Sequence, residues 1–171
     1  MSRIAGSGRD LAIWNARRQW VPILSTIAAI LLVALPIVMT SPVVPDFAFL
    51  VLIAWRLLRP EMWLAQVALP LGLLNDLVAG HPIGQSMALW TLTFLVLDLV
   101  DSRVGWRDHW MDWLFAAALI LAYTAGGWYV GRLMGSQAAF AVLIPQILLS
   151  VFAYPLVARL VVGLDRWRLA R

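Results

Sequence analysis

The sequence predicts an all-α, polytopic membrane protein built as a bundle of six transmembrane helices. Its 171 residues are 63% hydrophobic and only 13% charged, whereas an average soluble domain carries about 25% charged residues. Six spans of about 20 residues would use roughly 120 positions, so only tails and short loops would remain. This arithmetic excludes a separate nucleotide-binding, DNA-binding or secreted catalytic domain, and we expect no nucleic-acid partner.

The six spans are expected at apolar segments covering residues 21–39, 43–58, 62–78, 83–100, 110–134 and 138–164. The second is the weakest, because its unbroken apolar part, residues 47–55, is short enough for a re-entrant segment. A basic cytoplasmic tail over residues 1–20 is expected before the transmembrane domain, residues 21–164, and a second one over residues 165–171. Residues 9–18 could form either a surface helix or a frayed tail.

Arginine placement favours six spans with both termini in the cytoplasm. With six spans, twelve of the 13 basic residues lie on the inner side, and Arg132 alone lies outside. If the second segment did not span, five would lie inside and eight outside. The positive-inside rule therefore selects six spans, and the tryptophans gather at the same inner face.

The densest motif joins the third and fourth spans and carries Gly72, Asn75, Asp76, Gly80, Pro82 and Gly84. Asp76 lies near the end of its helix and within the membrane core, where a carboxylate needs a compensating partner. The candidates are Arg132, the NH groups that begin the fourth span, or water, and we expect an ion pair with Arg132. The motif indicates a tight outer turn; a ligand cavity, proton relay or partner-docking site are alternatives.

Small residues recur on the fifth span. Gly127, Gly131 and Gly135 follow an i, i+4, i+8 spacing and predict a helix-packing face, either inside the bundle or for the helix of a partner. Ala118, Ala122 and Gly126 form a second small stripe.

At the inner face, Asp98 and Asp101 share one helical side close to Arg56 and Arg59 in the predicted topology, which indicates a salt-bridge cluster or, alternatively, a docking surface.

Signatures of catalysis and of cofactor binding are missing from the sequence. There is no cysteine and there are only two histidines, so neither a thiolate site nor a histidine-rich metal site is expected. No nucleophile elbow, zinc-protease motif or phosphate-binding glycine loop occurs. We expect no catalytic residues, no cofactor and no metal.

The chain resembles the rod shape-determining protein MreD family of bacterial inner membranes. The resemblance rests on the six-span layout, on Pro45-Asp46-Phe47 entering the second span, and on Gly72-Leu73-Leu74-Asn75-Asp76 followed by Pro82-Ile83-Gly84. It implies a non-enzymatic scaffold subunit of the cell-elongation machinery that binds the single-span scaffold MreC and links MreB filaments to peptidoglycan synthases. It also implies a fold similar to the substrate-binding subunits of energy-coupling-factor transporters. The alternative function is a solute-binding membrane subunit of a vitamin-type transporter.

Overall fold

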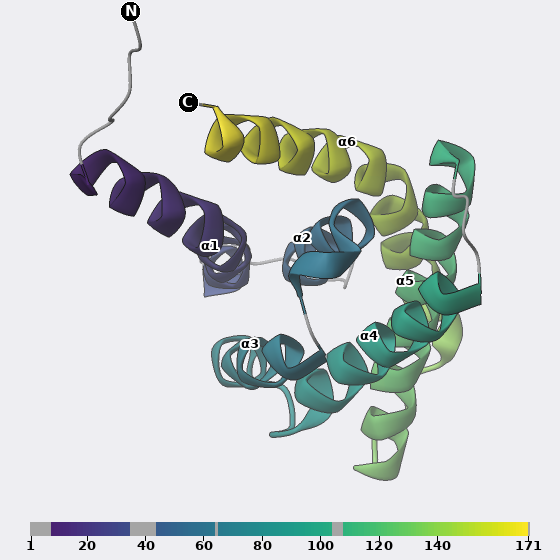
Figure 1. The fold of residues 1–171 in the computed structure, drawn as a ribbon. Coiled ribbons are helices and arrows are strands. Elements are labelled where there is room, and N and C mark those ends of the chain that lie inside the picture. The colour runs from purple at the N-terminus through teal and green to yellow at the C-terminus, as the bar shows by residue number, and fades with distance from the viewer. Residues whose placement is uncertain (1–7, 35–43, 64, 104–107, 171) are drawn as a thin grey trace, which may run out of the picture.

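The computed structural model describes residues 8–34, 44–63, 65–103 and 108–170 (Figure 1). These residues form six α-helices, which are α1 (Gly8–Leu31), α2 (Phe47–Leu58), α3 (Ala65–Ala79), α4 (Gln85–Arg103), α5 (His109–Leu133) and α6 (Ile144–Leu169). Short 3-10 helices lie at Leu32–Ala34 (η1), Pro60–Met62 (η2) and Phe140–Leu143 (η3). No β-strand occurs within these ranges, which confirms the all-α class.

Helix α2 is the centre of the bundle. Figure 1 shows it with α1, α3 and α6 around it, and it packs against α1, α5 and α6. Nearly every residue from Ala48 to Leu57 is buried, including Phe49 and Trp55. Apart from Arg56, α2 is apolar on all its faces, as expected of a helix buried in a core.

The outer surface of the bundle is also apolar. Exposed large hydrophobic side chains cover α4, α5 and α6; they include Leu92, Leu95, Leu99, Leu114, Leu121, Leu148, Phe152, Leu156 and Leu160. An apolar surface of this extent suits contact with lipid. Within the described ranges, two helical stretches are long and apolar enough to cross a membrane, Trp110–Leu133 and Phe140–Leu169. The number of spans remains a prediction.

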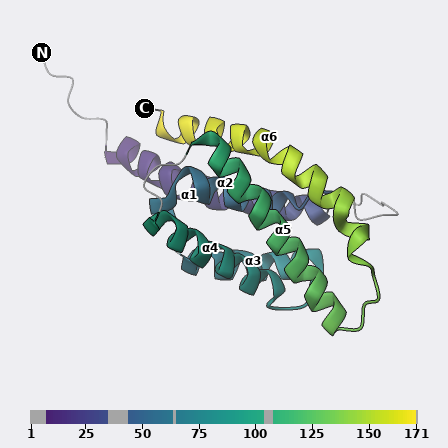
Figure 2. The same cartoon turned by 90° about the vertical axis from the view of Figure 1, so that its right-hand side faces the viewer.

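Two helices extend into the expected tails. Helix α6 runs to Leu169, and Asp165 and Arg168 pair with each other one turn apart near its end. Helix α1 begins at Gly8, so the described part of the N-terminal segment is helical rather than frayed. Helices α5 and α6 pack against each other, and Figure 2 shows the segment that connects them on the side of the bundle away from the C-terminus.

The expected cluster of charges forms at one end of the bundle. Arg56, whose side chain is 2% exposed, pairs with both Asp98 and Asp101 of α4, the latter at 2.9 Å between Nη1 and Oδ2. This confirms the predicted proximity of these three residues. The carboxylates neutralise an arginine that α2 carries into the core.

A second ion pair in this cluster links α2 to the end of α6. Arg59 pairs with Asp165 at 2.8 Å between Nη2 and Oδ2, and this hydrogen bond raises the pKa of Arg59 above its ordinary value. The guanidinium of Arg168 lies 5.4 Å from the centre of the Trp55 ring. Residues distant in sequence therefore close this end of the bundle.

We predict that Arg56→Met destabilises the purified protein by about 1–3 kcal/mol, because it leaves two carboxylates without their cation. Thermal unfolding in detergent would measure the change. Arg103→Met, which removes an exposed arginine at the end of α4, is the matched control and should have a small effect. Equal losses in the two variants would show that Arg56 does not stabilise the fold through this pairing.

Candidate functional site

The turn between α3 and α4 is organised by the carboxylate of Asp76. Its side chain is fully buried. Oδ2 accepts a hydrogen bond from the Gly84 backbone NH at 2.9 Å, and Oδ1 accepts one from the Ser86 NH at 2.8 Å. The first NH groups of a helix have no partner within it and carry its positive dipole end. Helix α4 thus compensates the carboxylate of Asp76, which lies unfavourably near the C-terminus of α3.

Three glycines permit this turn. Gly80 and Gly84 have φ angles of 69° and 97°, which glycine adopts without steric cost. Gly72 lies where α3 and α4 approach closely, since a Cβ there would come within 2.6 Å of the Met87 Cα. Pro82 precedes α4, and its carbonyl accepts a hydrogen bond from the Gln85 NH at 3.0 Å. The structure places the motif residues together in one turn.

Neighbouring side chains extend the Asp76 network. The Asn75 amide donates to the Ser86 hydroxyl at 3.0 Å, and His81 Nδ1 lies 3.3 Å from the same hydroxyl. His81 Nδ1 is also 3.9 Å from Asp76 Oδ1. Ser86 is therefore the common neighbour of Asn75, Asp76 and His81, and no pattern in the sequence indicates it.

The predicted ion pair between Asp76 and Arg132 is wrong. Arg132 is exposed on the last turn of α5, and its guanidinium lies 5.6 Å from the centre of the Trp128 ring. The backbone NH groups of α4 provide the compensation that the pair was expected to supply.

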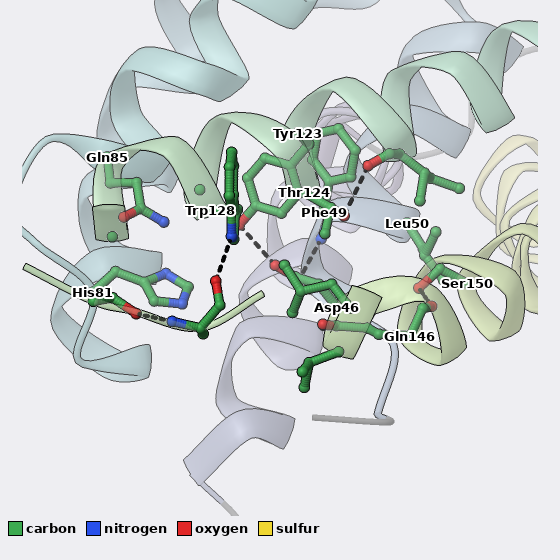
Figure 3. A pocket seen from close by; sticks show the side chains of 17 residues that line it. Asp46, Phe49, Leu50, His81, Gln85, Tyr123, Thr124, Trp128, Gln146 and Ser150 are labelled. Carbon is green, nitrogen blue, oxygen red and sulfur yellow. Dashed lines mark hydrogen bonds between the residues drawn. The ribbon is translucent and has the colours of Figure 1, made fainter. Parts of the chain in front are cut away.

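A cavity of about 370 Å³ lies beside this turn (Figure 3). Its lining comes from the start of α2, the α3–α4 turn, α5, the segment after α5, and the start of α6. The lining residues are Asp46, Phe49, Leu50, His81, Gln85, Ile120, Tyr123, Thr124, Gly127, Trp128, Gly131, Ser136, Ala138, Val142, Leu143, Gln146 and Ser150.

The expected glycine face on α5 is divided in the structure. Gly127 and Gly131 line the cavity. Gly135 lies beyond the helix at φ 94°, where the Ser136 NH donates to the Gly131 carbonyl and the Gly135 NH to that of Arg132. This is a Schellman motif, in which glycine ends the helix. The three glycines therefore do not form one helix-packing face.

Asp46 connects α2 to α5 at the edge of the cavity. Its Oδ1 accepts from the Phe49 NH at 3.0 Å and caps α2, while its Oδ2 accepts from the Tyr123 hydroxyl at 2.8 Å. The rings of Phe49 and Tyr123 stack with their centres 4.2 Å apart. The sequence signal was an aspartate directly before an apolar run, which is typical of an N-cap; nothing in the spacing indicates Tyr123.

We predict that Asp76→Asn destabilises the protein by about 1–3 kcal/mol, since an amide nitrogen cannot accept from a buried NH. Thermal unfolding in detergent would measure this loss. Arg132→Gln should cost less than about 0.5 kcal/mol, as expected for an exposed side chain. If Arg132→Gln lowered the stability as much as Asp76→Asn does, the result would support an ion pair between Asp76 and Arg132.

Comparison with known proteins identifies the family. A search of curated proteins and a search of solved structures each gave no match. The family model described as rod shape-determining protein MreD matches residues 15–164, which include the Asp76 turn, Asp46 and the described lining of the cavity. Since the match extends over most of its length, the chain belongs to the MreD family.

Proposed function

We propose that this protein is a non-enzymatic, integral-membrane scaffold subunit of the rod-shape machinery. In this proposal it binds the single-span scaffold MreC and, with it, links MreB filaments to peptidoglycan synthesis. The observation that carries the proposal is the MreD family match over residues 15–164, because that family has a role in rod-shape determination.

The use of polar groups in the bundle supports a scaffold. The Asp76 carboxylate, the Asn75 amide and the Arg56 guanidinium all bond to other parts of the same bundle. These interactions fix helix positions and build a rigid body. Rigidity favours a protein that presents a fixed surface to partners.

The proposed contact for a partner helix is the small-residue stripe on α5. Ala118 and Ala122 are exposed one turn apart, and small residues let helix backbones approach closely in a membrane. The neighbouring Gly126 faces Leu89 of α4 and so belongs to packing inside the bundle.

The proposed location is the bacterial inner membrane, with six spans, both termini in the cytoplasm and a fold similar to substrate-binding subunits of energy-coupling-factor transporters. Arg56, Arg59 and Arg168 belong to one end of the bundle, and Arg132 lies at the end that holds the Asp76 turn. This segregation of arginine agrees with the positive-inside rule.

The decisive experiment is co-purification of the tagged protein from its own membranes in native nanodiscs, with quantitative mass spectrometry. We expect a single-span scaffold and cell-wall synthases. Ala122→Leu should reduce recovery of the single-span partner by about tenfold, a loss of ~1.4 kcal/mol, because a leucine prevents close packing.

The matched control is Ala88→Leu, which makes the same change at an exposed position of α4. If both variants recovered the single-span partner equally, the partner helix would not contact α5 at Ala122. Recovery of ATPase subunits with a large coupling membrane protein would instead overturn the scaffold function and favour a solute-binding subunit.

The orientation is tested by labelling single cysteines with an impermeant reagent in intact cells, because the chain has no cysteine of its own. Ser136→Cys and Ser102→Cys both place the thiol at exposed positions. We expect Ser136→Cys to label from outside and Ser102→Cys to label only after permeabilisation. The reverse pattern would contradict the proposed topology.

A further inference from the structure

We propose that the cavity between α2, α5 and the start of α6 binds a primary ammonium group, either on a lipid headgroup or on a free amine. This inference goes beyond the scaffold function, because it assigns a ligand to a cavity whichever proteins the bundle binds.

The charge of the lining selects a cation. Asp46 is the carboxylate in the lining, and no arginine or lysine lies among the described lining residues. Its two hydrogen-bond donors, the Phe49 NH and the Tyr123 hydroxyl, are both neutral. Asp46 is half-buried, and a partly buried carboxylate is costly without a compensating charge. An ammonium group would supply that charge, while a phosphate or a carboxylate would add to the cost.

Asp46 also has capacity for another donor. Each carboxylate oxygen offers about two lone-pair positions, and each oxygen of Asp46 accepts one hydrogen bond from the described residues. An ammonium group carries three donors. A ligand can therefore bond to Asp46 without disrupting either the cap of α2 or the link to Tyr123.

Two amides offer further acceptors around the cavity. The side-chain amides of Gln85 and Gln146 make no hydrogen bond within the described residues, and both line the cavity from opposite sides of Asp46 (Figure 3). By contrast, the hydroxyls of Thr124 and Ser150 already donate to backbone carbonyls of their own helices. Gln85 and Gln146 are thus the neutral groups available to a ligand.

The size and shape of the cavity fit a small ligand. A volume of about 370 Å³ lies within the range of small-molecule sites, roughly 300–1,000 Å³. Phe49, Leu50 and Ile120 are buried and form its floor, whereas Ser136, Ala138 and Val142 are exposed and mark its mouth. Tyr123 and Trp128 add aromatic side chains to the lining.

One cation already lies near the cavity. Arg132 stacks over Trp128 with 5.6 Å between its guanidinium carbon and the ring centre, but it does not line the cavity. Its exposed charge is screened by salt, so Arg132→Gln should keep or modestly tighten ammonium binding.

Two measurements on the full-length protein test the proposal and separate the two sources of the ligand. In detergent, ethanolamine is titrated by calorimetry, with propionate as the anionic probe. In nanodiscs of equimolar phosphatidylethanolamine and phosphatidylglycerol, native mass spectrometry records which lipid stays bound. Ethanolamine binding without lipid enrichment indicates a free amine, whereas retention of phosphatidylethanolamine indicates a headgroup.

Variants assign the binding to the cavity. Asp46→Asn keeps a good N-cap and removes the charge, and it should weaken ammonium binding by about tenfold or more. The matched control is Glu61→Gln, which makes the same charge change at an exposed position in η2 and should leave binding unchanged.

A second variant tests the cavity without changing Asp46, which also caps α2. Gly131→Leu places a side chain at the cavity wall, where a Cβ would meet only Ser136 at 3.8 Å, and should abolish binding by filling space. Binding of propionate in preference to ethanolamine, binding unaffected by either cavity variant, or no binding of either ammonium probe would each overturn the proposal. None of these outcomes bears on MreC co-purification, so the ligand and the scaffold function fail separately.

Discussion

The interaction on which the turn-bearing end of the bundle depends is the hydrogen bonding of Asp76 to the first NH groups of α4. Helices α3 and α4 pack closely along their lengths because Gly72 removes a side chain from their contact. Such an approach brings the C-terminus of α3 close to the N-terminus of α4, and the carbonyl and NH groups at these ends have no partners within their own helices. A single buried carboxylate satisfies two of those NH groups. Uncharged side chains would provide weaker bonds there.

The two ends of the bundle are closed by different chemistry. One end uses ion pairs between side chains, which join α2 to α4 through Arg56 and α2 to α6 through Arg59. The other end uses a carboxylate on backbone NH groups at Asp76, and again at Asp46. The ion pairs and Asp46 hold α2, whereas Asp76 joins α3 to α4. Most residues of α2 are buried. The central helix is therefore fixed at both ends by charged groups and along its length by apolar packing.

The helices and the turn could be predicted because each has a local pattern in the sequence. Apolar segments give the helices, and glycine with aspartate at fixed positions gives the turn. The partners of Asp76 could not be predicted, because nearly every residue has a backbone NH and the sequence does not show which of them lies near a carboxylate. An arginine is a rarer and more obvious candidate partner. Gly135 shares a helical face with Gly127 and Gly131 only if the helix continues to residue 135, whereas α5 ends at Leu133. Residue spacing does not determine a helix boundary to within two residues. Tyr123 and Ser86 lie far from their partners in sequence, so no local pattern indicates them.

The turn and the cavity share side chains, and this makes them one structural unit. Ser86, whose NH bonds to Asp76, has its side chain beside the Tyr123 hydroxyl, which donates to Asp46. Trp90 of α4 also lies beside that hydroxyl, and its ring is 6.4 Å from that of Phe49. Ser86 and Trp90 of α4 thus connect the turn to the side chains that surround Asp46. Coupling between two sites requires contiguous packed contacts, and Asp76, Ser86, Tyr123 and Asp46 form such a series of neighbours.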